Sequence, residues 1–380
     1  MRFCTACHGA VSDTCGGMPS KVGLALFACF VAIVLLAEVP SSSPPEPQDF
    51  LKKQMAFTTL DLSAVESGHI VVKLPKTGET REVAAFAIMQ LDVPVEFFLQ
   101  GMRDIVHFKR SDNVLEIGKF SDPPRLEDLS GLTLDPEEIE TIRHCRVSKC
   151  DFKLPARAID RFREEVNWSA PDYPERVTAL TRQMLLDHVT GYLQDGNTAL
   201  GDYDDKPYKL RLADELDALL QPAPYMYGYR PEFQKYLQHF PRARPAQVES
   251  FVYWSKEAFG LKPVVSVTHV TVYRLSGAKG SDVLIASKGI YANHYLEGSF
   301  GLTAFIHGKS SALPRTYLVY VNRSRTDALR GLFAGLKRTL IGGRLRDGAR
   351  KNMEVLRAKL ESQYVAATAD PVDAVASVPR

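Results

Sequence analysis

Five consecutive segments after residue 247 show the two-residue side-chain periodicity of β-strands, and this run constrains the fold more than any other feature. They span 248–260, 262–275, 281–295, 298–308 and 315–324, and Gly, Ser, Lys or Pro residues separate them. Such β-branched and aromatic runs between turn residues are typical of consecutive strands, so the sequence predicts an antiparallel meander. In the second segment, Val265, Val267, His269, Thr271 and Tyr273 share one face. Neither face is purely polar, which predicts a sheet covered by a helix or curved around a cavity.

A long helix is predicted after the strands, from Asp327 as a possible N-cap to about Gln363. Apolar residues recur along it at three- and four-residue spacing, and Gly342 with Gly343 is expected to kink it. Its other face is basic, with Lys337, Arg338, Arg344, Arg346, Arg350, Lys351, Arg357 and Lys359. That face is either the solvated side of a docked helix or a surface that contacts anionic lipid headgroups.

The first half of the body is mixed. Two β-rich runs flank "PKTGE" and predict a strand pair, a helix is expected after Pro94, and "NVLEIGKFS" predicts a short strand. Asp135, followed by Pro136, Glu137 and Glu138, is a typical helix start. Residues 152–246 are mainly helical, with apolar stripes that form core or cavity wall, among them Phe162 and Met184. His188 lies beside a stripe and is interpreted as a surface or packed histidine, with a site role as the alternative.

These patterns together predict the α+β class, with a curved antiparallel sheet, a long C-terminal helix and a helical insertion. We expect a single domain over 47–365, with the insertion at about 152–246 and a disordered tail over 366–380.

The N-terminal segment 1–46 is predicted to direct export. "VGLALFACFVAIVLLA" is uncharged throughout and is followed by a Pro/Ser-rich linker. Its length lies between that of the apolar region of a signal peptide and that of a full membrane span, so a cleaved signal and a retained anchor both stay open. We expect an exported protein, periplasmic or membrane-anchored. A start at Met18 leaves the short basic leader "MPSK" directly before the apolar run, which makes Met18 the better candidate for the translation start. The haem-attachment pattern "CTACHG" then lies outside the protein.

Cys145 and Cys150 are the only cysteines outside the first thirty residues, and we predict that they form a disulfide after export. The alternative is two half-buried thiols. A metal site is not predicted, because His144 adds only a third ligand and no second pair completes the shell.

The charge and motif content excludes several function classes. A net charge of +2 over 380 residues gives no overall field for nucleic acid. "HGKSSA" lacks the first glycine of a phosphate-binding loop, and "EGSFG" lacks the first glycine of a nucleophile elbow. No cofactor is indicated.

A family resemblance is borne by "EVAAFAIMQLDVPVEFFLQGMRDI" and "RTYLVYVNRSRTDALRGLFAGLKRTL". A strand that leads through a proline into a short helix, then a curved antiparallel sheet and a long final helix, resembles the START-like helix-grip (SRPBCC) superfamily. The resemblance implies a hydrophobic or lipid-like ligand in a cavity between the sheet and the final helix. It implies no catalytic residue, because no catalytic signature defines the superfamily.

Polar and aromatic residues on the predicted sheet are the candidate ligand-binding groups, since a few such groups in an apolar pocket fix a headgroup. They are Tyr253, Trp254, His269, Tyr273, Tyr291, Asn293, His294, Tyr295 and Arg323. Each could instead be an ordinary core or sheet-surface residue. The first alternative function is an envelope enzyme that uses His269 or His294 as acid or base on a lipid-like or ester substrate. The second is a protein-interaction module without a cavity.

Overall fold

The computed structural model describes residues 51–53, 55–221, 231–258, 262–274, 283–307, 316–331 and 334–369. The predicted export segment 1–46 lies outside these residues, as does 370–380. Export, the anchor and the start at Met18 therefore stay predictions.

The predicted meander is confirmed. Its strands are β6 (Val248–Glu257), β7 (Val264–Arg274), β8 (Val283–Ala292), β9 (Leu296–His307) and β10 (Thr316–Thr326), each antiparallel to the next. The predicted strand pair is also present, as β1 (Val71–Lys73) and β2 (Glu82–Leu91), and β2 pairs with β10. The short predicted strand is β3 (Val114–Lys119), which pairs with β6. The eight strands have the order β1-β2-β10-β9-β8-β7-β6-β3 and form an open sheet rather than a barrel.

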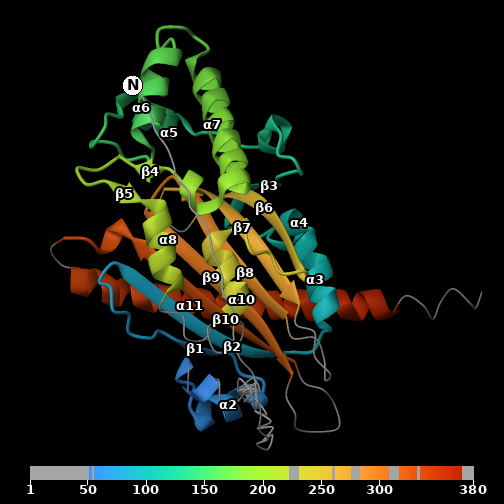
Figure 1. Cartoon of the computed structure of the whole chain (residues 1–380). Coiled ribbons are helices and arrows are strands. Elements are labelled where there is room, and N and C mark those ends of the chain that lie inside the picture. The colour runs from blue at the N-terminus through green and yellow to red at the C-terminus, as the bar shows by residue number, and fades with distance from the viewer. Residues whose placement is uncertain are drawn as a thin grey trace, which may run out of the picture. The chain divides into compact units, whose positions relative to one another are not determined.

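One face of the sheet is covered by α3 (Val95–Arg103), α4 (Ile105–Phe108) and the long C-terminal helix α11 (Ala334–Ala369). Figure 1 shows α11 crossing behind the strands. Phe98 of α3 and Met353 and Leu360 of α11 are buried here among strand residues such as Val270 and Phe305. This apolar cluster lies between the sheet and the final helix, where the family resemblance implies a ligand.

The start of α11 differs from the prediction. Asp327 opens a 3₁₀ turn, η3 (Asp327–Leu329), whose N-cap is Thr326. The Asp327 carboxylate instead accepts a hydrogen bond from Lys153 Nζ at 2.7 Å. The helix then runs without interruption through Gly342 and Gly343 and extends to Ala369, beyond the expected start of the tail.

The opposite face is covered by the long connection between β3 and β6. Its elements are η1 (Leu126–Leu129), α5 (Pro136–His144), α6 (Ala156–Glu165), α7 (Tyr173–Asp195), η2 (Gly196–Ala199), β4 (Asp202–Tyr203), β5 (Leu210–Arg211), α8 (Leu212–Leu220) and α10 (Pro231–His239). The helix α2 (Thr59–Glu66) packs into the same core. Figure 1 shows α8 and α10 in front of the sheet, and α7 extending upward beyond the ends of the strands. The predicted α+β class, with its helical insertion and long final helix, is thereby confirmed, and it is compatible with a helix-grip fold.

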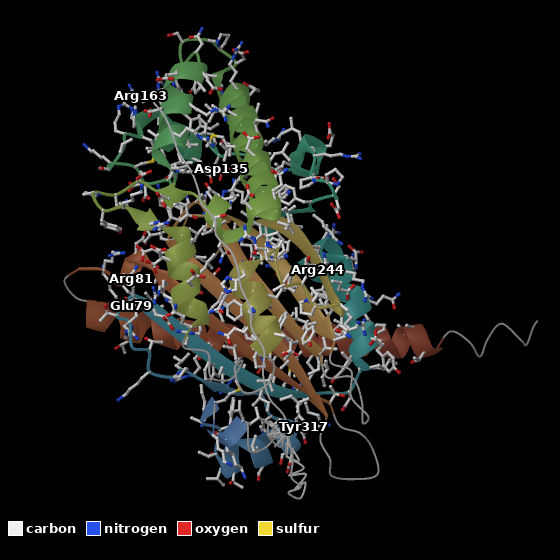
Figure 2. All side chains as sticks on the ribbon, in the orientation of Figure 1. Glu79, Arg81, Asp135, Arg163, Arg244 and Tyr317 are labelled. Carbon is white, nitrogen blue, oxygen red and sulfur yellow. A yellow bond between two sulfur atoms is a disulfide. The ribbon has the colours of Figure 1, made fainter. Side chains whose placement is uncertain are left out.

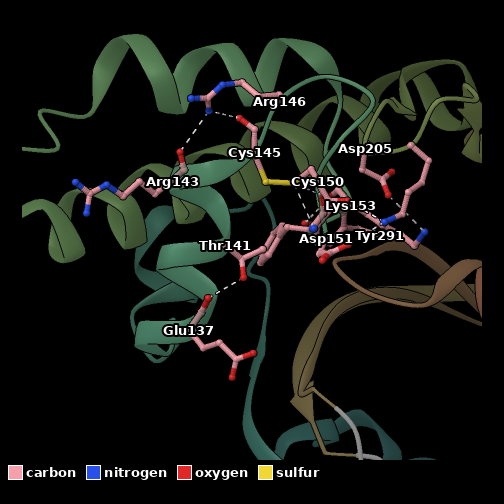
Figure 3. Close-up of a disulfide and its surroundings, with 12 residues drawn as sticks. Glu137, Thr141, Arg143, Cys145, Arg146, Cys150, Asp151, Lys153, Asp205 and Tyr291 are labelled. Atoms are coloured by element: carbon pink, nitrogen blue, oxygen red, sulfur yellow. Dashed lines mark hydrogen bonds and ion pairs between the residues drawn. A yellow bond between two sulfur atoms is a disulfide. The ribbon is translucent and has the colours of Figure 1, made fainter.

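The segment just before residue 152, in the connection between β3 and β6, is stabilised by a helix cap and a disulfide, both of which the sequence indicates. Asp135 and Glu138 form a capping box at α5, with Pro136 in the first turn. A disulfide joins Cys145 at the end of α5 to Cys150, with Cα atoms 4.5 Å apart (Figure 3). Both cysteines are buried in a small apolar cluster with Phe152 and Phe162.

Candidate functional site

A pocket of about 350 Å³ lies within the insertion and against the end of β8. Its apolar wall includes Leu154, Ala158, Phe162, Met184, Leu185 and Leu212, and its polar groups include Arg157, Thr181, His188, Tyr203 and Tyr291. Drug-sized and smaller ligands occupy pockets of this volume and character. The stripes predicted as core or cavity wall contribute Phe162 and Met184 to it.

The helix α7 presents one face to this pocket. Thr181, Met184, Leu185, His188 and Gly191 line it, and their spacing of three and four residues places them on one side of an α-helix. A Cβ atom added at Gly191 would meet only the Ala199 Cβ atom, at 3.7 Å, so a side chain fits at this position. Because Gly191 and Ala199 both line the pocket, we expect a large side chain at position 191 to take up pocket volume.

Three titratable side chains line the pocket in uncharged form. His188 Nε2 lies 2.8 Å from the Ile290 carbonyl oxygen, which assigns the proton to Nε2 and leaves Nδ1 as an acceptor. Burial lowers the pKa of His188, although the bond to Ile290 opposes this. Burial raises the pKa of Tyr203 and of Tyr291, so both phenols stay protonated at neutral pH. The Tyr291 hydroxyl donates to the Lys153 carbonyl at 3.3 Å.

Of the nine candidate ligand-binding residues, Tyr291 lines this pocket. Trp254, His269, Tyr273 and Arg323 lie on the same face of the sheet, and each makes a polar contact with another residue of the protein. His269 Nε2 has no hydrogen-bond partner among the described residues. Trp254 Nε1 donates to the Asp128 carbonyl at 2.8 Å, and the Tyr273 hydroxyl donates to Glu232 at 2.9 Å. Tyr253 lies on the opposite face, where its hydroxyl accepts a hydrogen bond from Lys109.

Three candidates follow β8 directly and stabilise the turn into β9. Asn293 accepts a hydrogen bond from Val265 N–H at 2.8 Å and is fully buried. The His294 ring packs edge-on against Phe152, and burial lowers its pKa to about 4. Tyr295 has a positive φ of 56°, and its hydroxyl accepts a hydrogen bond from Lys262 N–H. Asn293 and Tyr295 thus bind other parts of the protein, whereas His294 Nε2 is buried with no hydrogen-bond partner among the described residues.

Arg323 belongs to an ion-pair network at the start of β2 and the end of β10. Its Nε atom donates to Glu82 Oε1 at 2.7 Å, and both side chains are buried. Nearby, Arg81 pairs with the buried Glu297 at 2.6 Å and with Glu79 at 3.3 Å. Figure 2 shows Glu79 and Arg81 next to each other at this edge of the sheet.

His269 lies in a closed aromatic cluster between the sheet and the insertion. The Tyr192 hydroxyl is 2.8 Å from His269 Nδ1, and the Phe240 ring centroid is 4.5 Å from that of His269. Lys288 stands directly opposite His269 on β8 and donates to Asn197 at 2.9 Å. Burial lowers the pKa of His269 well below its ordinary value and that of Lys288 to about 7.

The sequence matches no protein-family model and no curated protein. Among the described residues, no group of three or more His, Cys, Asp or Glu side chains is placed to hold a metal ion. Within the same part of the chain, no helix has the length and apolar character needed to cross a membrane.

Several pocket residues were not among the predicted site residues. Arg157, Thr181 and Tyr203 come from α6, α7 and β4, and nothing in their local sequence links them. For His188 the sequence offers a site role only as the alternative. The sequence feature that points to the pocket is the pair of apolar stripes in α6 and α7.

Proposed function

We propose that the protein binds a small, mainly apolar molecule in the pocket of the insertion. The observation that supports this most directly is the pocket itself, whose lining is largely apolar and includes the uncharged polar side chains of Thr181, His188 and Tyr203. Uncharged donors and acceptors on an apolar wall orient a ligand without the desolvation cost of a buried charge.

We also propose that the chain is a START-like protein whose ligand site lies on the face of the sheet opposite the final helix. The order of strand, short helix, antiparallel meander and long final helix supports the relationship. In the resemblance, the ligand lies between the sheet and the final helix. In this chain, Phe98, Met353 and their neighbours pack between the sheet and α11, and the pocket described above lies on the other side of the sheet.

Substitution at Gly191 tests the proposed pocket. We expect the neutral fluorophore 1-aminoanthracene to bind the wild-type protein, with fluorescence enhancement as the measurement. Gly191→Leu should weaken binding at least about tenfold, because the added side chain occupies pocket volume. Gly191→Ala is the matched control: its Cβ makes only a 3.7 Å contact, so it should keep binding and slightly stabilise α7.

Two results would contradict the proposal. One is wild-type protein that neither binds the fluorophore nor yields an apolar molecule on organic extraction and mass spectrometry. The other is equal affinity in wild type and Gly191→Leu, with thermal unfolding confirming that both proteins are folded.

The outward face of α11 supports a second proposal, contact with an anionic membrane surface. Lys337, Arg344 and Lys351 recur every seven residues, which places them on one side of the helix. Met353 and Leu360, which are buried against the sheet, lie on the opposite side. All three cations are exposed, with no ion-pair partner among the described residues.

Vesicle co-sedimentation tests this face. Binding to vesicles of phosphatidylserine and phosphatidylcholine, but not of phosphatidylcholine alone, is expected at low salt, with about 1 kcal/mol from each cation. Asp347 and Glu354 flank the stripe and should weaken the effect. Replacing the three cations by glutamine should abolish binding. The control removes the same charge from the insertion side through Lys149→Gln, Lys235→Gln and Arg242→Gln, and equal losses in both triple variants would refute a specific surface.

A further inference from the structure

The charged residues that line the pocket are not equally compensated. Arg161 pairs with Glu165 at 2.5 Å and lies 3.6 Å from Asp187, which also lines the pocket. Asp202, the other lining acid, pairs with Lys209 at 2.7 Å. Each of these three lining charges therefore has an opposite charge of the protein within 4 Å.

Arg157 is the exception. It lines the pocket and is exposed, and no ion pair or hydrogen bond of its side chain is found among the described residues. It lies in the first turn of α6, where a cation opposes the positive end of the helix dipole and lowers helix stability slightly. Helix stability therefore does not account for an arginine at this position.

The remaining polar lining adds no charge. His188, Tyr203 and Tyr291 are all uncharged at neutral pH, as described above. The pocket thus combines a largely apolar lining with one cation, Arg157, that has no ion-pair partner among the described residues.

We infer that the ligand is an amphipathic carboxylate, whose apolar body fills the pocket and whose single negative charge is bound by Arg157. This inference rests on the proposed pocket and specifies its ligand class. A guanidinium matches the two oxygens of a carboxylate and donates two parallel hydrogen bonds to them. A single cation balances a monoanion, whereas a phosphate monoester would leave a second charge uncompensated.

A matched pair of ligands tests the assignment: 2-naphthoate and the neutral 2-naphthalenemethanol. We expect wild-type protein to bind 2-naphthoate roughly tenfold more tightly, because only that ligand makes a charge-assisted bond. Arg157→Gln should remove the preference by weakening 2-naphthoate binding about tenfold, with 2-naphthalenemethanol unaffected. The control is Arg163→Gln, on the same helix, because Arg163 pairs with Asp160 and is not among the residues that line the pocket.

The outcomes separate this inference from the proposal beneath it. If neither ligand binds, or if Gly191→Leu does not weaken either, the pocket proposal fails. If both bind and both are blocked by Gly191→Leu, but Arg157→Gln leaves their affinity ratio unchanged, only the carboxylate assignment fails. Tighter binding of 2-naphthyl phosphate than of 2-naphthoate, lost in Arg157→Gln, would overturn the carboxylate in favour of a phosphate.

Discussion

Replacing Arg323 with methionine is expected to lower the free energy of unfolding by about 3 kcal/mol. Arg323 and Glu82 are both buried, and Arg323 Nε lies 2.7 Å from Glu82 Oε1. Without Arg323, the one ion-pair partner left to the Glu82 carboxylate among the described residues is Arg325, whose Nε atom is 3.6 Å away. The remaining buried charge is then poorly compensated, which costs more than the lost contact itself. Urea denaturation at neutral pH measures the change.

An exposed pair provides the control for Arg323. Arg274 binds Glu96 with much of both side chains in solvent, so Arg274→Met should cost less than about 1 kcal/mol. The double variant Glu82→Leu/Arg323→Met should recover part of the loss, because it removes both charges. The opposite pattern, normal stability of Arg323→Met with loss of 1-aminoanthracene binding, would return Arg323 to the role of a ligand-binding residue.

The sheet was predictable because its information is local. Each strand of the meander shows period-two alternation and ends at turn residues, so strand identity and antiparallel order follow from the sequence. The start of α5 was predictable for the same reason, since its capping box lies within four residues. The start of α11 was not predictable, because the Asp327 carboxylate binds Lys153, a residue 174 positions earlier, and does not cap the helix.

The structure places the predicted ligand-binding residues on both faces of the sheet, and the sequence already contained the reason. Tyr253 and Trp254 are neighbours in one strand, so their side chains must point to opposite faces of the sheet. The structure places Tyr253 toward α11 and Trp254 toward the insertion. No single cavity on one face could have included both.

The pocket itself depends on long-range packing. Its residues come from α6, α7, β4, α8 and the end of β8, and no local pattern specifies how these segments meet. The alternation in β7 showed apolar residues on both faces, but it could not show that the insertion covers the second face. What the sequence did provide was the pair of apolar stripes, whose members Phe162 and Met184 form part of the wall.

A second large effect is expected at Lys288, which is 1% exposed and lies between the sheet and the insertion. Lys288→Met should raise the free energy of unfolding by about 2 kcal/mol at pH 7. Burial lowers the pKa of Lys288 from 10.5 to about 7, with Asp217 opposing the shift, and each pKa unit corresponds to 1.36 kcal/mol. The gain is smaller than the full shift because the Asn197 and Leu237 oxygens that Lys288 binds lose their donor.

The pH dependence of this gain identifies its cause. Between pH 7 and pH 10 the unfolded chain keeps the Lys288 proton while the folded chain has released it, so the wild-type protein gains stability as pH rises. The advantage of Lys288→Met should therefore shrink toward pH 10, in urea denaturation at several pH values. Lys235→Met, at an exposed position on α10, should show no such trend. A constant difference across this range would mean that packing, rather than the cost of a buried ammonium group, separates the two proteins.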